Sequence, residues 1–262
     1  VKVKGSVITF QERVADPQIT DKPWFTLRMS EGKPFKSNVQ YPRPDFSMNE
    51  KYPNVKQVWR RTDNTDIGAG AVQSGKYVVY ANTSGIIYAL DAATGNELWK
   101  YKTGGKIFST PAIFGKGDGA SVIIGSCDTY IYSLNIKSGK VNWKFKCEKS
   151  VLGSPAIYGG KVYIGASDRT FRALNAKTGK LIWENKDVKG FIEAKPFVDK
   201  DQVVIGDWAN RLYSFNPANG KLQWEWNVKG SRMYSPAAVW PIKANGNIIF
   251  ATPERVTYGL NA

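Results

Sequence analysis

The chain has 262 residues and carries 37 Lys or Arg against 22 Asp or Glu, which gives a formal net charge of +15. It contains no histidine, the commonest general base and metal ligand, so zinc hydrolysis and Ser-His-Asp catalysis are not expected within it. No run of 18 apolar residues occurs, so no membrane-spanning helix is expected either.

Residues 1–54 differ in pattern from the rest of the chain. The stretch VKVKGSVITFQ at 1–11 alternates apolar and polar residues as a β-strand does. Residues 31–54 contain four prolines and are expected to form an extended linker. Because the chain starts at Val1 rather than at a Met, we expect that it was processed or cut from something longer. One interpretation is that residues 1–54 are the tail of an upstream domain.

From residue 55 onward the sequence repeats. Tryptophan recurs at intervals of 40, 44, 40 and 41 residues, at Trp59, Trp99, Trp143, Trp183 and Trp224. The last four tryptophans end a shared phrase, which reads LDAATGNELW, LNIKSGKVNW, LNAKTGKLIW and FNPANGKLQW. A fifth copy begins at Leu260. Self-similarity at such a period indicates a repeat architecture.

The shared phrase predicts a tight turn followed by a strand. Its Asp or Asn side chain can accept hydrogen bonds from backbone N–H groups ahead of it and so start a turn. Its glycine can adopt the positive φ that a tight turn needs, at Gly95, Gly139, Gly179 and Gly220. The large flat tryptophan is then expected to pack between neighbouring sheets.

Three further strand patterns recur in each unit. In the second unit they are IFSTPAIF at 107–114, SVIIG at 121–125 and YIYSL at 130–134. Together with the tryptophan strand they make four short, β-branched and aromatic strands for every 40 or so residues, separated by glycine-rich turns. This pattern is typical of a β-propeller and predicts an all-β fold of four-stranded blades over residues 55–262.

The number of blades depends on the two ends of the repeat. Four units are complete, whereas the last one, at 231–262, lacks its tryptophan strand. The segment around Trp59 is a spare tryptophan strand. Because open sheet edges invite aggregation, we predict that this segment completes the last blade and closes a ring of five. The alternative is a truncated ring of six to eight blades.

The phrase [DN]-x-x-[TS]-G-x-x-x-W, with Ser-Pro-Ala upstream, resembles the pyrroloquinoline-quinone-like repeat over residues 55–262. That repeat occurs in quinoprotein alcohol dehydrogenases and in the propeller lipoprotein of the outer-membrane barrel assembly machinery. The resemblance implies a bacterial protein that is periplasmic or associated with the outer membrane. Calcineurin-like metallophosphoesterases fused to such propellers are a known architecture. If it applies, residues 1–54 would be the tail of that upstream catalytic domain, and this chain would be its accessory domain.

The resemblance also raises quinone-dependent catalysis. The related dehydrogenases hold their quinone with adjacent cysteines, a calcium with acidic ligands and a catalytic Asp. Here Cys127 and Cys147 follow the second and fourth strands of one blade, about 9.6 Å apart, whereas a disulfide needs Cα atoms within about 7 Å. Asp128, Asp168 and Asp207 recur after the second strand and are interpreted as turn residues. We therefore expect free thiols, and no cofactor, metal or catalytic residue.

Candidate binding residues lie at the mouth of the propeller channel. Where other units have Ser or Thr before Pro, the fourth has Lys195, with Glu193 two residues earlier. Since strand side chains alternate between faces, both lie on one side and are predicted to form a charged pair near the mouth. Trp208, Arg232 and Tyr234 are predicted to join them.

The opposite face collects lysines in its turns, among them Lys137, Lys177 and Lys221. We interpret them as solvated turn residues, and the absence of interleaved aromatic residues does not favour nucleic acid. The sequence thus favours a non-catalytic binding or scaffold module of the cell envelope, with a protein or anionic-glycan partner at the channel mouth. The alternatives are a quinoprotein-like oxidoreductase domain and the accessory domain of a metallophosphoesterase.

Overall fold

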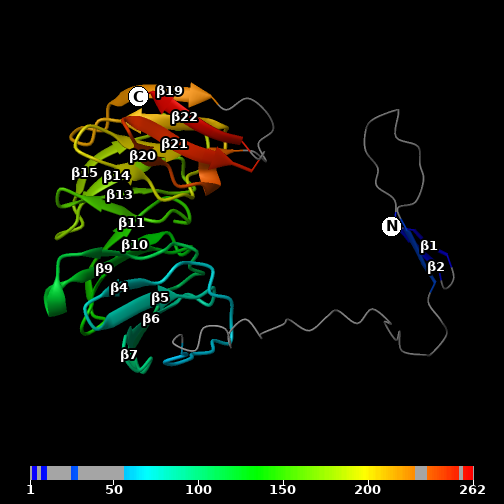
Figure 1. Cartoon of the computed structure of the whole chain (residues 1–262), viewed down its shortest axis with the longest axis horizontal. Helices are drawn as coiled ribbons and strands as arrows, with labels where there is room; N and C mark the ends of the chain where they lie inside the picture. The colour runs from blue at the N-terminus through cyan, green and yellow to red at the C-terminus, as the bar shows by residue number, and fades with distance from the viewer. Residues whose placement is uncertain are drawn as a thin grey trace. The chain divides into compact units, whose positions relative to one another are not determined.

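The computed structural model describes residues 2–4, 7–10, 25–28, 56–227, 235–253 and 256–261 (Figure 1). The chain divides into two compact units, Val1–Lys56 and Gln57–Ala262. In the first unit an antiparallel sheet has the order β1 (Lys2–Lys4), β2 (Val7–Phe10) and β3 (Phe25–Arg28). The strand pattern at 1–11 therefore forms two paired strands, in which Val3 lies opposite Ile8. The predicted linker at 31–54 lies outside the described residues.

The described residues of the second unit form five antiparallel sheets, which we call blades 1 to 5. Blade 1 comprises β4 (Val72–Ser74), β5 (Tyr77–Ala81), β6 (Ile86–Asp91) and β7 (Glu97–Lys102). Blade 2 comprises β8 (Ala112–Phe114), β9 (Ser121–Gly125), β10 (Tyr130–Asn135) and β11 (Val141–Lys146). Blade 3 comprises β12 (Ala156–Tyr158), β13 (Lys161–Gly165), β14 (Phe171–Asn175) and β15 (Leu181–Asn185).

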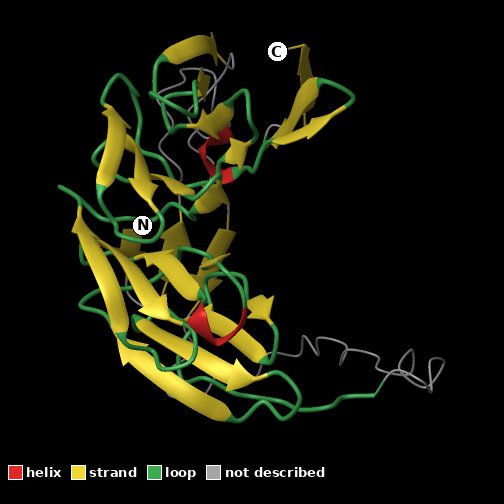
Figure 2. Cartoon of the chain, turned by 90° about the vertical axis from the view of Figure 1, so that its left-hand side faces the viewer, coloured by secondary structure: helices red, strands yellow, loops and turns green. Residues whose placement is uncertain are grey.

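Blade 4 comprises β16 (Phe197–Val198), β17 (Val203–Gly206), β18 (Arg211–Phe215) and β19 (Leu222–Asn227), and blade 5 comprises β20 (Ile242–Ala244), β21 (Asn247–Thr252) and β22 (Val256–Asn261). Short 3-10 turns at Gly117–Gly119 and Pro236–Ala238 are the helical segments seen in Figure 2. None of the described helical segments is long and apolar enough to cross a membrane. The blades follow one another in chain order, from cyan to red in Figure 1, and confirm the predicted all-β class.

The hydrophobic core lies between successive blades. One buried cluster joins Val79 and Ile87 of blade 1 to Ile124 of blade 2. Similar clusters join blades 2 and 3, blades 3 and 4, and blades 4 and 5. Because each strand alternates its side chains between two faces, a sheet in this stack can bury apolar residues against both neighbours. The first strands of blades 1 to 4 contact one another in order, so they form the inner edge of the series.

Each docking tryptophan binds the turn of the next blade. The Nε1 of Trp143 in blade 2 donates a hydrogen bond of 3.1 Å to the carbonyl of Ala176, at the turn of blade 3. A methyl group added to Gly179 in that turn would lie 2.6 Å from the Trp143 ring. Three equivalent pairs repeat this contact, and they are Trp59 with Gly95, Trp99 with Gly139 and Trp183 with Gly220. The predicted packing of tryptophan between sheets is confirmed for these four.

The tight contact makes Gly179 a sensitive position. Gly179 has a φ of 72°, so Gly179→Ala adds left-handed strain to the clash with Trp143 and is expected to destabilise by about 2–4 kcal/mol. The control is Gly159→Ala, where φ is 54° and an added methyl meets no atom within 4 Å, so only about 1 kcal/mol is expected. Urea unfolding followed by circular dichroism measures both. Equal losses would show that the Trp143 contact does not restrict the glycine.

The prediction that the Trp59 segment completes the last blade is wrong. The sheet of blade 5 has three strands in the order β20-β21-β22, and the segment around Trp59 is not paired with it. Trp59 instead docks on blade 1, where its Nε1 donates a hydrogen bond of 2.9 Å to the carbonyl of Ala92. It thus occupies the place that the tryptophan of a preceding blade would take. The described blades form an open series, not a closed ring of five.

Candidate functional site

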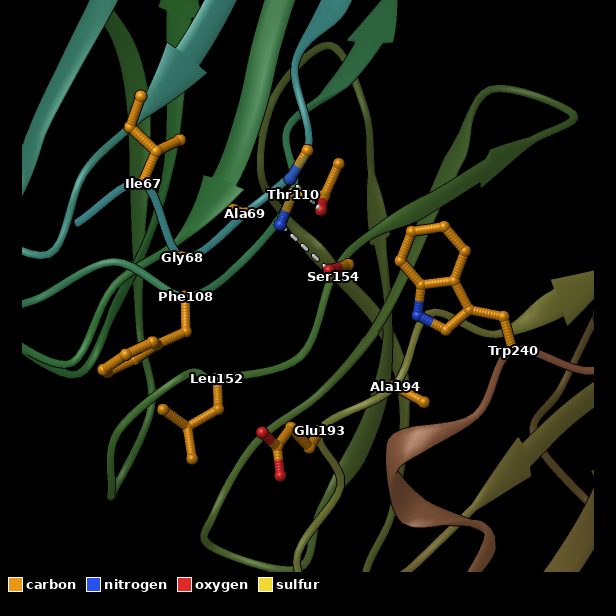
Figure 3. Close-up of a pocket in the computed structure, with 11 residues that line it drawn as sticks. Ile67, Gly68, Ala69, Phe108, Thr110, Leu152, Ser154, Glu193, Ala194 and Trp240 are labelled. Atoms are coloured by element: carbon orange, nitrogen blue, oxygen red, sulfur yellow. Dashed lines mark hydrogen bonds between the residues drawn. The ribbon is translucent and has the colours of Figure 1, made fainter. Parts of the chain in front are cut away.

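A pocket of about 420 Å³ lies at the inner edge of the five blades (Figure 3). Each blade contributes the segment that leads into its first strand. The apolar side chains of the lining are Ile67, Phe108, Leu152 and Trp240, and the polar ones are Thr110, Ser154 and Glu193. The volume falls within the range of about 300–1,000 Å³ that is usual for small-ligand sites.

One position recurs beside the pocket in every blade. This position lies two residues before the first strand and is occupied by Gly70, Thr110, Ser154, Lys195 and Trp240, of which all but Lys195 line the pocket. Hydrogen bonds join the first three blades there. The N–H of Gly70 donates to Thr110 Oγ1 at 3.0 Å, and the N–H of Thr110 donates to Ser154 Oγ at 2.9 Å. The Ser or Thr noted in the sequence therefore links neighbouring blades at the pocket wall.

Glu193 and Lys195 do not form the predicted charged pair. Glu193 Oε2 instead accepts a hydrogen bond of 2.9 Å from Trp208 Nε1. The Lys195 Nζ lies 5.7 Å from the centroid of the Trp240 ring, a cation–π distance. Each charged side chain thus has an aromatic partner, and the ion pair is replaced by these two contacts.

The other sequence candidates have separate outcomes. Trp208 donates to Glu193 and its ring packs on Phe191 with centroids 5.6 Å apart, but it is not among the residues that line the pocket. Arg232 and Tyr234 lie outside the described residues. The sequence reasoning did not select Phe108 or Trp240, although both are exposed aromatic residues that line the pocket.

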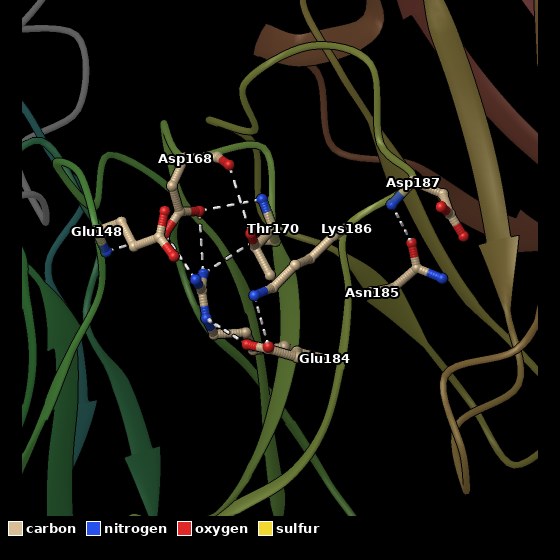
Figure 4. A network of polar contacts seen from close by, with 8 residues as sticks. Glu148, Asp168, Thr170, Glu184, Asn185, Lys186 and Asp187 are labelled. Carbon is tan, nitrogen blue, oxygen red and sulfur yellow. Dashed lines mark hydrogen bonds and ion pairs between the residues drawn. The ribbon is translucent and has the colours of Figure 1, made fainter.

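A second polar site lies inside blade 3 (Figure 4). Arg172 Nη2 and Asp168 Oδ2 are 2.6 Å apart, and their side chains are 4% and 1% exposed. Asp168 also accepts hydrogen bonds from the backbone N–H of Thr170 at 3.0 Å and of Glu148 at 3.2 Å. Burial alone would raise the pKa of Asp168, but the hydrogen bonds and charge of Arg172 outweigh it and lower the pKa below its ordinary value.

Equivalent aspartates use the same contacts in the neighbouring blades. Asp128 accepts from the N–H of Tyr130 at 3.1 Å and of Gly104 at 2.7 Å. Asp207 accepts from the N–H of Ala209 at 2.9 Å and of Gly190 at 2.7 Å. Each carboxylate therefore holds its own turn and ties it to the loop that arrives from the preceding blade. The interpretation of these residues as turn aspartates is confirmed.

Cys127 and Cys147 are both free, as predicted. Burial raises the pKa of the Cys147 thiol to about 12, and burial also raises that of Cys127, so both thiols are protonated at neutral pH. In the part of the chain that the structure describes, no three His, Cys, Asp or Glu side chains gather in a group that could hold a metal. The donor set that the resemblance associates with a bound quinone is therefore not assembled among these residues.

Comparison with known proteins identifies the family to which this chain belongs. The family model described as outer membrane protein assembly factor BamB matches residues 53–117 and 112–240. The chain belongs to this family. Membership in the BamB family confirms the predicted resemblance to the pyrroloquinoline-quinone-like repeat. A search of curated proteins found no match.

Three solved structures share the fold. BamB from Moraxella catarrhalis has a TM-score of 0.63 at 20% identity, covering 75% of this chain and 61% of its own. Quinohemoprotein alcohol dehydrogenase ADHIIG from Pseudomonas putida HK5 has a TM-score of 0.63 at 15% identity, covering 78% and 41%. The quinohemoprotein alcohol dehydrogenase from Comamonas testosteroni has a TM-score of 0.60 at 16% identity, covering 75% and 41%. The chain thus spans 61% of the length of that BamB structure, and these identities show the fold alone.

Proposed function

We propose that this BamB-family propeller is a non-catalytic binding module of the bacterial envelope, periplasmic or associated with the outer membrane, that holds a protein partner at the pocket. The observation that carries the proposal is the exposure of aromatic residues around a pocket to which all five blades contribute. Phe108 is 40% exposed and Trp240 is 52% exposed. Exposed aromatic residues beside a pocket are typical of protein–protein interfaces, where they act as anchors for the partner.

The basic turns on the other face are less suited to this role, because several of their lysines are already paired. Lys137 lies 2.9 Å from Asp118, and Lys243 lies 2.9 Å from Asp199. These contacts support the interpretation of solvated turns and reduce the free positive charge available to an anionic glycan. No contact among the described residues favours the quinoprotein-like or the phosphoesterase alternative over a binding module.

Site-specific photo-crosslinking in a bacterial host that makes the full-length protein tests the proposal. A photoreactive phenylalanine analogue at Phe108 is expected to give a discrete crosslinked product with one protein. The matched control is Tyr158, an aromatic residue that is 41% exposed at the far end of β12, where no product is expected. Equal products at both positions, or none at Phe108, would contradict a partner at the pocket.

A further inference from the structure

We propose that the pocket receives a cationic side chain of the partner, an arginine or a lysine, with Glu193 as its counter-charge. This inference rests on the proposed function and adds the chemical class of the group that is bound. Among the described residues that line the pocket, Glu193 is the one that carries a charge. Its carboxylate supplies a negative charge to the pocket wall, and this charge complements a cation.

The carboxylate is free to accept a charged donor. Its Oε2 accepts a hydrogen bond from Trp208 Nε1, which is a neutral group, and Glu193 has no ion pair within the described residues. Lys195, the cation two residues away, lies over the ring of Trp240 and not against Glu193. A hydrogen bond from a charged donor is shorter and stronger than one from a neutral donor. A cationic ligand group would therefore bind the Glu193 carboxylate more strongly than a neutral group would.

The rest of the lining suits the stem of such a side chain. Phe108, Leu152 and Trp240 provide apolar surface in the same pocket (Figure 3). Arginine and lysine lay their methylene stems along apolar surface while the charged head reaches a polar group. A carboxylate or phosphate ligand would meet the repulsion of Glu193 instead.

Two hydroxyl groups favour arginine over lysine. Thr110 Oγ1 and Ser154 Oγ each accept one backbone N–H, which leaves each oxygen a second lone pair for a donor. A guanidinium has five donors in a fixed plane, so it can reach a carboxylate and a hydroxyl together, whereas an ammonium is a compact point charge. We therefore infer that the pocket prefers an arginine.

Nuclear magnetic resonance of the indole N–H groups tests this inference on the full chain. Trp240 lines the pocket and Trp208 is bonded to Glu193, so both indole signals report on the site, and each signal is assigned by replacing that tryptophan with Phe. N-acetylarginine amide is expected to shift both signals in a saturable way. N-acetylcitrulline amide, which has nearly the same shape without the charge, is expected to bind at least about tenfold more weakly. N-acetylglutamate amide is expected not to bind.

Three variants test whether Glu193 is the residue that binds the arginine amide. Glu193→Gln is expected to weaken arginine amide binding at least about tenfold, since it removes the charge and keeps the shape. The matched control is Glu225→Gln, because Glu225 lies on β19 of the same blade, outside the pocket, and pairs with Arg211. Its affinity is expected to be unchanged. Lys195→Met is expected to strengthen binding a few-fold, because it removes a neighbouring positive charge and keeps an apolar stem on Trp240.

Several outcomes would overturn the inference. These are equal affinity for citrulline and arginine amides, wild-type affinity in Glu193→Gln, or tighter binding of the glutamate amide. A crosslink at Phe108 without binding of arginine amide would refute the proposed cationic side chain, whereas the proposed protein partner at the pocket would still be supported. Arginine amide binding without any crosslink at Phe108 would support the ligand class and contradict the protein partner.

Discussion

Replacing Trp143 by Ala is expected to lower the free energy of unfolding by about 3–5 kcal/mol. Trp143 is 9% exposed and belongs to the buried cluster that joins blades 2 and 3. Its removal leaves a cavity and also leaves the buried carbonyl of Ala176 without the Nε1 donor. A buried acceptor without a partner adds its own desolvation cost to that of the cavity. Because the lost contact joins two blades, we expect the whole propeller to be destabilised.

Trp224→Ala is the matched control, since Trp224 holds the same place in blade 4. It is only half-buried, and its indole donates no hydrogen bond within the described residues. We expect less than half of the Trp143 loss in urea unfolding followed by far-UV circular dichroism, a signal that does not depend on tryptophan emission. Trp224 also packs against the cluster that joins its blade to the next. Equal losses in the two variants would therefore show that the fuller burial of Trp143 and its hydrogen bond to the next turn add nothing to stability.

The turns and their docking tryptophans were predictable because their chemistry is local and is repeated four times. In blade 3 the Asn175 side chain accepts from the N–H of Lys177 at 3.0 Å and of Thr178 at 2.9 Å, as the phrase predicts. Gly179 closes the same turn with a positive φ. What the sequence did not show is that each tryptophan docks on the following turn, because that depends on how two blades stack.

The position of blade 5 shows why a motif can mislead. Ser235, Pro236 and Ala237 repeat the Ser-Pro-Ala of blade 3, in which the alanine, Ala156, begins the first strand β12. In the structure Pro236–Ala238 is a 3-10 turn, and β20 begins at Ile242. The Ser235 hydroxyl donates to the carbonyl of Asp207, so these residues pack on blade 4. Trp240 consequently takes the equivalent of the Lys195 position and enters the pocket.

Glu193 and Lys195 could be selected from the sequence as departures from the repeat, but their placement could not be predicted. Strand alternation was used to put both on one side, whereas in the structure both precede β16 (Phe197–Val198), outside the strand, and of the two Glu193 alone lines the pocket. Their contacts with Trp208 and Trp240 come from loops that are distant in the sequence. The pocket itself requires five equivalent segments to meet, which pattern along one chain does not reveal.

A similar loss of stability is expected when the buried ion pair of Arg172 and Asp168 is broken, and the equivalent residue of blade 2 supplies the control substitution. Arg172→Ala is expected to destabilise by about 3–5 kcal/mol at neutral pH, because it leaves the buried Asp168 carboxylate without its counter-charge. In blade 2 the equivalent residue is Tyr132, whose hydroxyl donates to Asp128 at 2.6 Å. Arg172→Tyr keeps a donor for Asp168, so we expect less than half of the loss seen with Ala.

The pH dependence separates this explanation from a loss of packing alone. In the wild type the pKa of Asp168 is lowered, so its contribution is present above the unfolded value of about 3.9 and is lost as the pH falls through the folded value. Without Arg172, burial raises the pKa, and the variant regains stability by taking up a proton. The difference in unfolding free energy between wild type and Arg172→Ala is therefore expected to narrow from about pH 7 to about pH 5. A constant difference across this range would mean that Arg172 acts through its packing and not through its charge.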